Sequence, residues 1–243
     1  MPTAILKDPN AVDGIIKSTE IVQTSRFIHI YGVSGAGKTR LAAQFPKPFF
    51  FDFDNGLLSA KDFNWDAKCY FAPTESGRAT MWDTFAKDWK KLLKTDSYQT
   101  FVFDSVTTMG DACLAWVQAL KGRADSQATL PEWGQAIGLL ADLHYDLRAY
   151  GKDIISISVE ELVKDEITGK IRERPMVLGQ KLSQRMPLWY DEFWRIAVVS
   201  DSKEDQRTRL LHTAPGDSFY AKSRSNLPNI KNPTYDKIKE YFK

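Results

Sequence analysis

One eight-residue stretch constrains the fold of this chain most. Residues Gly32–Thr39, GVSGAGKT, fit the phosphate-binding pattern GxxxxGK[ST]. The apolar run Phe27–Tyr31 before it predicts a buried strand, and Lys38–Phe45 after it predicts a helix that stops before Pro46. A strand, a glycine-rich loop and a helix in this order are the context that the pattern requires. The sequence therefore predicts a P-loop that binds the phosphates of a nucleotide.

Each residue type in this loop has a separate task. Glycines let backbone N–H groups approach an anion, and the N-terminus of the following helix adds partial positive charge. We expect Lys38 to reach the β- and γ-phosphates of ATP and the Thr39 hydroxyl to hold Mg²⁺, which prefers oxygen ligands. The predicted nucleotide-binding residues are Gly32, Val33, Ser34, Gly35, Ala36, Gly37, Lys38, Thr39 and Arg40.

Composition limits the class of protein. The 243 residues contain no Pro/Gly/Ser-rich linker, so we expect one domain over residues 26–243 after a weakly patterned N-terminal segment, residues 1–25. No apolar run approaches the ~20 residues needed to span a bilayer, the start lacks a signal-peptide core, and two cysteines are too few for a disulfide framework. We therefore expect a cytoplasmic protein without a membrane partner. The net charge of +2 is too small to indicate nucleic-acid binding without local clustering.

Buried apolar runs alternate with helical segments through the first two thirds of the chain. The runs at 48–54, 100–105 and 153–158 predict strands, and the segments 80–93 and 109–120 predict helices. This alternation is typical of an α/β fold with a mostly parallel central sheet flanked by helices.

Segments in the second half of the chain complete the expected architecture. Residues 129–134 are expected to interrupt a helical pattern that resumes through 144–150. In the last third, a hairpin at 161–176 and alternating segments at 191–199 and 207–213 predict antiparallel strands added to the parallel core.

Two of the predicted strands end in carboxylates. Asp104 ends TFVFD in the form of a Walker B strand, so we expect it to pair with the Mg²⁺ that Thr39 holds, although it could also cap a helix. Asp52 and Asp54 share one face of PFFFDFD, and Asp54 lies closer to the carboxyl edge where ligands bind. We therefore expect Asp54 to orient the attacking water, while Asp52 is either catalytic or a turn-facing or salt-bridged acid.

In combination, these segments make the chain resemble RecA-type ATPases. More narrowly, it resembles the phage-encoded RecA-like nucleotide-binding proteins that include single-strand annealing recombinases. The resemblance covers roughly residues 26–228 and is carried by YGVSGAGKTRLAAQFPKPFFFDFDNG, TFVFDSVTTM, LPEWGQAIGLLADLHYDLRAYGKDIISIS and AKSRSNLP. It implies a RecA-like P-loop NTPase fold, hydrolysis of ATP to ADP and phosphate with magnesium, and action on single-stranded DNA in phage recombination, annealing or repair.

This chain departs from the RecA-type pattern at two positions, and the resemblance implies one further site. The acid ending the second strand is usually a glutamate, and here it is Asp54, one methylene shorter. The Gln or His that senses the γ-phosphate is missing, because the run after residues 154–158 continues Val159-Glu160-Glu161. The run Lys222-Ser223-Arg224 resembles a basic motif that reaches the γ-phosphate of a neighbouring subunit. Arg224 is therefore predicted to be catalytic in a homo-oligomer with ATP at its interfaces, or else part of a solvated basic turn.

The resemblance also implies where DNA would bind. In RecA-like proteins DNA meets two loops that correspond here to residues 121–133 and 160–185. The second contains the basic residues Lys164, Lys170, Arg172, Arg174, Lys181 and Arg185. Binding of phosphates by this cluster would depend on salt. The partner would be single-stranded DNA, either bare or coated by a single-strand-binding protein, and the alternative is a solvated hairpin without a ligand.

Two other function classes remain open from the sequence. A non-catalytic scaffold or loader would use bound nucleotide only to order an interface, which fits the missing sensor and the short Asp54. A small-molecule P-loop kinase would need a substrate-binding segment, and none stands out in the sequence.

Overall fold

The structure, a computed structural model, describes residues 3–5, 21–23, 25–72, 77–124, 126–164, 166, 169–200 and 207–242. Most of the predicted N-terminal segment, residues 1–25, lies outside this part of the chain. Its described pieces are β1 (Thr3–Ile5) and β2 (Ile21–Gln23), which pair antiparallel in a separate two-stranded sheet.

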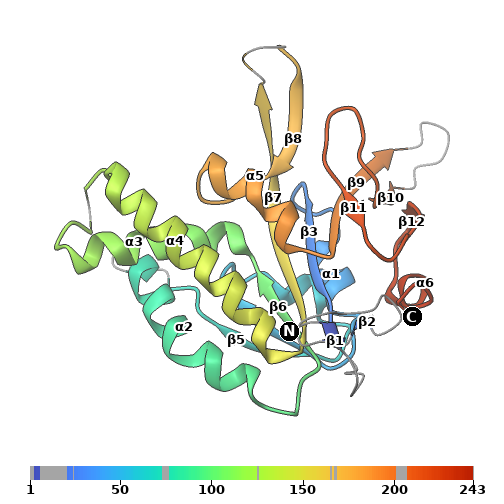
Figure 1. Ribbon diagram of the computed structural model, residues 1–243, viewed down its shortest axis with the longest axis horizontal. Coiled ribbons are helices and arrows are strands. Elements are labelled where there is room, and N and C mark those ends of the chain that lie inside the picture. Colours follow the sequence, from blue (N-terminus) through green and yellow to red (C-terminus); the bar gives the residue numbers. More distant parts are fainter. Residues whose placement is uncertain are drawn as a thin grey trace, which may run out of the picture.

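A ten-stranded mixed sheet organises the rest of the described chain (Figure 1). Its main path runs β12-β10-β9-β3-β7-β6-β4-β5, with β8 joined to β7 and β11 joined to β9. Neighbours are parallel from β9 to β5, and this parallel core consists of β9 (Glu192–Ser200), β3 (Phe27–Gly32), β7 (Asp153–Lys164), β6 (Thr100–Asp104), β4 (Pro48–Asp52) and β5 (Asp66–Cys69). The antiparallel additions are β8 (Ile171–Pro175), β10 (Arg207–His212), β11 (Lys222–Ser223) and β12 (Ile230–Lys231).

Helices cover both faces of this sheet. One face packs against α2 (Gly77–Leu93), α3 (Val106–Leu120), α4 (Leu130–Leu147) and α5 (Gln180–Trp189). The other packs against α1 (Lys38–Ala42), the short 3-10 helix η2 (Leu57–Ala60) and α6 (Tyr235–Lys239), while a second 3-10 helix, η3 (Arg148–Tyr150), follows α4. Because both faces are covered, β3, β4 and β6 are buried along their whole length. The predicted fold class, an α/β fold with a mostly parallel sheet and antiparallel strands in the last third, is confirmed.

The direction of β9 differs from the prediction. The segment 191–199 was expected to be antiparallel, and β9 does pair antiparallel with β10 and β11, yet it pairs parallel with β3. An alternating pattern of apolar residues predicts a strand but carries no information about direction. Here α5 returns the chain to the amino end of β3 before β9 begins, so β9 extends the parallel core beside the P-loop strand.

The helix α4 also differs from the prediction, because it continues through Pro131 and Gly134. Thr129 is its N-cap, and the Glu132 carboxylate accepts the backbone N–H of Thr129 at 2.7 Å in a capping box. Proline is tolerated in the first helical turn, where its missing N–H has no partner in the helix. Residues 129–134 therefore begin a helix instead of interrupting one. No helix in the described part of the chain is both long and apolar enough to cross a membrane.

Candidate nucleotide-binding site

The predicted P-loop connects β3 to α1 at the carboxyl edge of the sheet. A Cβ on Gly32 would lie 2.2 Å from the backbone oxygen of Ile196 on the adjacent strand β9, so only glycine fits at this end of the loop. At the other end, Gly37 has a φ of 98° immediately before α1. The loop therefore depends on glycine where it leaves the sheet and where it enters the helix.

Lys38 is folded back over the loop that precedes it. Its Nζ donates hydrogen bonds to the backbone oxygens of Gly32 at 2.8 Å and Val33 at 2.9 Å, and the residue is only 8% exposed. Burial lowers the pKa of its ammonium group, while nearby carboxylates oppose that shift. These bonds hold a desolvated cation beside the loop, which is where a phosphate chain would need it.

Thr39 and Asp104 meet as predicted. The Thr39 hydroxyl donates to Oδ2 of Asp104 at 2.7 Å, which joins the start of α1 to the end of β6. Burial, together with the nearby charges of Asp54 and Asp52, raises the pKa of Asp104 to about 7, although the Thr39 hydrogen bond and the Lys38 charge act to lower it. A hydroxyl and a carboxylate side by side fit Mg²⁺, which takes few protein oxygens and completes its shell with water and phosphate. Thr39 and Asp104 are therefore the residues that would hold the ion.

The two acids of β4 have different surroundings. Asp52 is 3% exposed, and its Oδ1 accepts the backbone N–H groups of Asp54 at 3.1 Å and Gly56 at 3.4 Å. It therefore fixes the turn after β4, the alternative considered from the sequence. Asp54 is exposed and lines the cleft beside the P-loop. Of the two acids, only Asp54 is placed to meet a water molecule in that cleft.

The cleft has a volume of 480 Å³, within the range of about 300–1,000 Å³ usual for small-molecule sites. Six of the predicted nucleotide-binding residues line it: Ser34, Gly35, Gly37, Lys38, Thr39 and Arg40. The other three support it through backbone oxygens, since those of Gly32 and Val33 hold Lys38 and that of Ala36 holds an arginine.

That arginine is Arg209, which the sequence interpretation missed. It lies on β10, and its Nε donates to the backbone oxygen of Ala36 at 3.0 Å. Its side chain packs so closely against the loop that a Cβ on Gly37 would lie 2.8 Å from the same Nε. Arg209 therefore joins Lys38 and Arg40 as a third cation on the wall of the cleft, contributed by a strand far from the P-loop in sequence.

Comparison with known proteins supplies the family. The model of a family described as AAA domain, AAA_24, matches residues 24–225, well over half of the chain. The chain belongs to this family. This AAA domain is also similar to the solved structure of a KaiC-like protein from the hyperthermophilic archaeon Pyrococcus horikoshii OT3, with a TM-score of 0.46 and 14% identity over 79% of this chain and 80% of that chain. No curated protein matches the sequence.

Arg224 does not join the cleft of this AAA domain. Its Nη1 donates to Oδ1 of Asp191 at 2.6 Å, and Asp191 also accepts the backbone N–H of Phe27 at 3.0 Å. Phe27 starts β3 and Gly32 ends it, so Arg224 lies at the opposite edge of the sheet from the P-loop. The structure thus brings together Lys38, Thr39, Asp54 and Asp104, and leaves the catalytic role of Arg224 toward a neighbouring subunit as a prediction.

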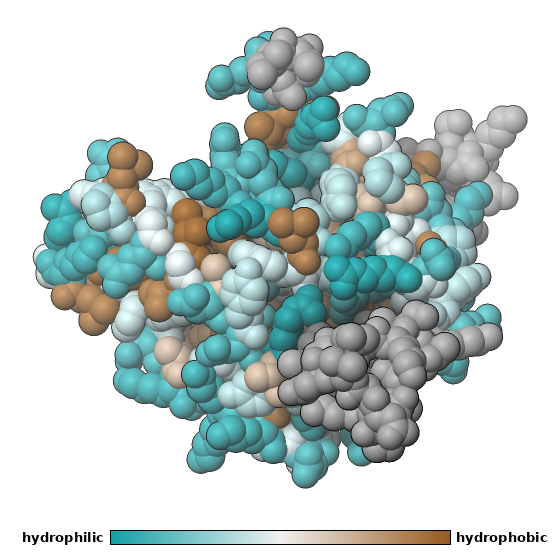
Figure 2. All heavy atoms as spheres, viewed as in Figure 1, coloured by the Kyte–Doolittle hydropathy of each residue, from teal (hydrophilic) through white to brown (hydrophobic). Residues whose placement is uncertain are grey.

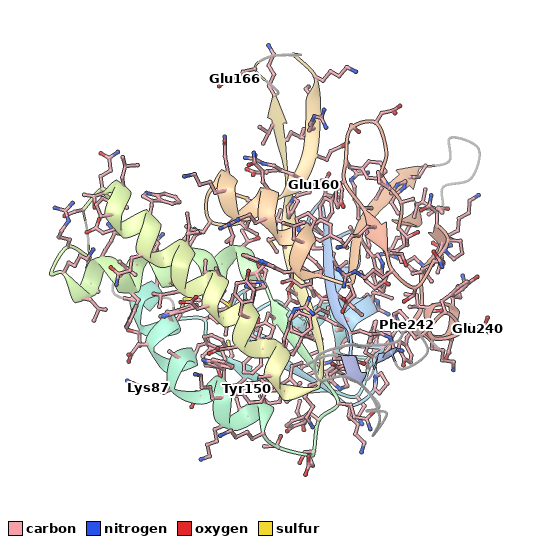
Figure 3. All side chains as sticks on the ribbon, viewed as in Figure 1. Lys87, Tyr150, Glu160, Glu166, Glu240 and Phe242 are labelled. Carbon is pink, nitrogen blue, oxygen red and sulfur yellow. The ribbon has the colours of Figure 1, made fainter. Side chains whose placement is uncertain are left out.

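Glu160 lies within β7, just after the run 154–158 where the resemblance implies a sensor residue, and its carboxylate is paired with an arginine. Arg195 binds both of its carboxylate oxygens, at 2.6 Å and 3.1 Å, and its side chain is only 5% exposed. Glu160 lies at the base of a projecting hairpin formed by β7 and β8 (Figure 3). A buried ion pair therefore lies at the point where β7 passes from the cleft into the hairpin.

Proposed function

We propose that this AAA domain protein binds ATP with Mg²⁺ and hydrolyses it to ADP and phosphate. The observation that carries the proposal is the convergence of Lys38, the Thr39–Asp104 pair and Asp54 on one cleft from three separate segments of the chain. A P-loop lysine, an oxygen pair for magnesium and an exposed carboxylate are the parts that phosphoryl transfer to water needs.

The chemistry would divide between these residues. Lys38 and Arg209 place positive charge against the phosphate oxygens, where negative charge develops as the bond between the γ-phosphorus and the bridging oxygen breaks. Asp54 accepts a hydrogen bond from the attacking water and takes its proton, and ADP leaves with the bridging oxygen. When bound by Thr39 and Asp104, Mg²⁺ compensates phosphate charge.

We further propose that the cleft is coupled to single-stranded DNA, in phage recombination, annealing or repair. Support comes from β7, which lines the cleft at Ile157 and Val159 and then continues into the β7–β8 hairpin. Figure 2 shows mostly hydrophilic side chains over this projecting hairpin. Arg174 in the hairpin is paired with Glu161 at 2.8 Å, which reduces its availability to DNA. Exposed basic side chains on the neighbouring helix α5, such as Lys181 and Arg185, are therefore the proposed contacts for DNA phosphates.

Head-to-tail assembly is the third part of the proposal. The Arg224 side chain is 57% exposed and forms a single 2.6 Å ion pair with a 6% exposed Asp191. A guanidinium this exposed can turn to a phosphate of a neighbouring subunit, and Asp191 would then keep the hydrogen bond from the backbone N–H of Phe27.

The test is phosphate release from ATP by the purified protein with and without single-stranded DNA, at low and high salt. DNA stimulation that falls with salt and is lost in Lys181→Glu/Arg185→Glu supports the proposal. A matched charge reversal at the exposed Lys91 of α2 should leave it unchanged. Turnover indifferent to DNA contradicts the DNA part, a phosphorylated small molecule favours the kinase, and tight ATP binding without turnover favours the scaffold.

A further inference from the structure

A row of buried polar side chains joins β3 to α4. His29 lies on β3, the strand that leads into the P-loop, and its ring contacts two serines of β7: Nδ1 lies 2.7 Å from Oγ of Ser156, and Nε2 lies 3.0 Å from Oγ of Ser158. Oγ of Ser156 lies 2.7 Å from the hydroxyl oxygen of Tyr190, and that oxygen lies 2.6 Å from Nε2 of His144 on α4. These five side chains, which we call the buried network, are each at most 5% exposed, and the proposed mechanism uses none of them.

The α4 end of the buried network fixes the direction of its hydrogen bonds. Nδ1 of His144 lies 2.6 Å from the backbone oxygen of Leu140, which can only accept, so this nitrogen carries a proton. Burial lowers the pKa of His144 to about 4, and the charge of Arg148 acts in the same direction, although the bond to Leu140 opposes both, so the ring is neutral at pH 7. A neutral imidazole has one N–H group. Nε2 of His144 therefore accepts a hydrogen bond from the hydroxyl of Tyr190.

The same reasoning extends through the network to β3. Because Tyr190 donates its only proton to His144, its oxygen accepts from the Ser156 hydroxyl. The oxygen of Ser156 in turn accepts from Nδ1 of His29. Burial lowers the pKa of His29 well below its usual value, so this ring is also neutral, and its Nε2 accepts from the hydroxyl of Ser158. Both histidines therefore carry their proton on Nδ1, and every hydrogen bond of the network points toward α4.

The other end of the buried network lies at the nucleotide cleft. His29 is on the strand that ends at Gly32, whose backbone oxygen accepts a hydrogen bond from Lys38. Ser158 lies in β7 between Ile157 and Val159, which both line the cleft. A change in the packing of α4 thus reaches both strands through hydrogen bonds between side chains.

We propose that the buried network is a conformational device in which the docking of α4 sets the tautomer of His29 beside the P-loop strand. While His144 accepts from Tyr190, a single arrangement of protons satisfies all of its members. The inference goes beyond the proposed function, because it concerns how the folded chain links a helix to the cleft and requires no bound nucleotide.

Withdrawal of His144 removes the acceptor that imposes this arrangement. A buried donor without a partner is costly, and a phenol is a stronger donor than an aliphatic hydroxyl, so Tyr190 then donates to Ser156. Ser156 in turn donates to Nδ1 of His29, and Nε2 of His29 donates to Ser158. Exchange with water during local opening supplies the change, since Nε2 gains one proton as Nδ1 loses one and the ring stays neutral. A displacement of α4 thereby reverses the hydrogen bonds between β3 and β7.

The test locates the imidazole protons by NMR of ¹⁵N-labelled histidine side chains in the nucleotide-free protein at about pH 7.5, because a ring nitrogen that carries a proton and one that does not have well-separated shifts. The sequence contains three histidines, His29, His144 and His212, so variants that remove them one at a time assign the signals. In the wild type, His29 and His144 should both carry their proton on Nδ1. A proton on Nε2 of either neutral ring would overturn the inference.

A substitution on α4 then tests whether this helix controls the state of His29. His144→Leu removes the acceptor and keeps apolar volume, so it should move the proton of His29 from Nδ1 to Nε2. His212→Leu on β10 is the matched control, because it removes an imidazole outside the buried network, and it should leave His29 unchanged.

A second substitution separates the hydrogen bond from packing. His144→Gln should keep the proton of His29 on Nδ1, because an amide can donate to the backbone oxygen four residues earlier and still accept from Tyr190. Gln44 in this protein has that arrangement: it donates to the backbone oxygen of Arg40 at 2.9 Å and accepts the backbone N–H of Tyr235 at 3.2 Å.

The remaining outcomes each decide the inference. If His29 keeps its proton on Nδ1 in His144→Leu, α4 does not set its tautomer and the inference is wrong. If His144→Gln moves the proton as His144→Leu does, altered packing explains the effect, and the inference is again wrong. If His144→Leu fails to fold, Tyr190→Phe keeps the ring and cuts the network, and His29 should then populate both tautomers. A proton wholly on Nδ1 in that variant would contradict the inference.

Discussion

Replacement of Arg209 by alanine tests how the folded chain assembles the cleft. Arg209 is far from the P-loop in sequence and contacts it only in the folded protein. Its Nε donates a hydrogen bond to the Ala36 backbone oxygen, and its side chain lines the cleft. A hydrogen bond to a charged group contributes about 1.5–3 kcal/mol. Losing one contact between the guanidinium and a phosphate should therefore weaken ATP binding by about 10- to 150-fold. Because the residue is exposed, the free energy of unfolding should change by less than about 1 kcal/mol.

Titration calorimetry with ATP and urea unfolding of the nucleotide-free protein together measure both quantities. Arg209→Lys should fall between the wild type and Arg209→Ala, because it keeps the charge but loses the Nε bond to Ala36. Arg224→Ala serves as the matched control for affinity, since that guanidinium lies at the opposite edge of the sheet. ATP affinity within twofold of wild type for Arg209→Ala, with Lys38→Ala still losing affinity, would refute this account of the cleft.

Three further predictions concern other charged groups. Because burial raises the pKa of Asp104 to about 7, the folded protein keeps a proton between about pH 4 and 7 that the unfolded chain has released, so this group makes stability fall as pH rises. Urea midpoints at pH 5 and 7.5 should differ less in Asp104→Asn than in wild type, and an equal difference would contradict the assignment. Arg195→Met should cost about 3 kcal/mol by leaving the buried Glu160 unpaired, as measured by urea unfolding. Adding Glu160→Gln should recover part of that loss, and strictly additive losses would count against the pair. Arg224→Ala should abolish turnover and spare ATP affinity, whereas turnover at the wild-type rate would remove Arg224 from the mechanism.

The sequence predicted those parts of the site that are formed by a few consecutive residues. The loop Gly32–Thr39 carries its own glycines and lysine, and Asp104 ends a wholly apolar run, so each is recognisable without knowledge of the fold. Met81, Phe85 and Trp89 recur every four residues in the segment 80–93, a spacing typical of one buried helix face, and all three are buried in α2.

The features that could not be predicted from the sequence are those that arise only when distant segments pack together. Nothing in RTRLLH distinguishes Arg209 from the arginine two positions before it, because its role arises only when β10 joins the sheet beside β9. The start of α4 is different, since Thr129 and Glu132 form a recognisable capping-box signature that Pro131 and Gly134 obscured. Its position was therefore predictable, whereas the direction of β9 was not.

The most direct test of the central claim is a comparison of ATP binding and single-turnover hydrolysis in wild type, Lys38→Ala and Asp54→Asn. The cleft geometry predicts that Lys38→Ala loses affinity. Asp54→Asn should bind ATP as tightly as wild type and lose turnover by at least about 100-fold, within the range expected for removing a general base. Wild-type turnover in Asp54→Asn would contradict its placement as the residue that activates water. Unchanged ATP affinity in Lys38→Ala would contradict the site as a whole.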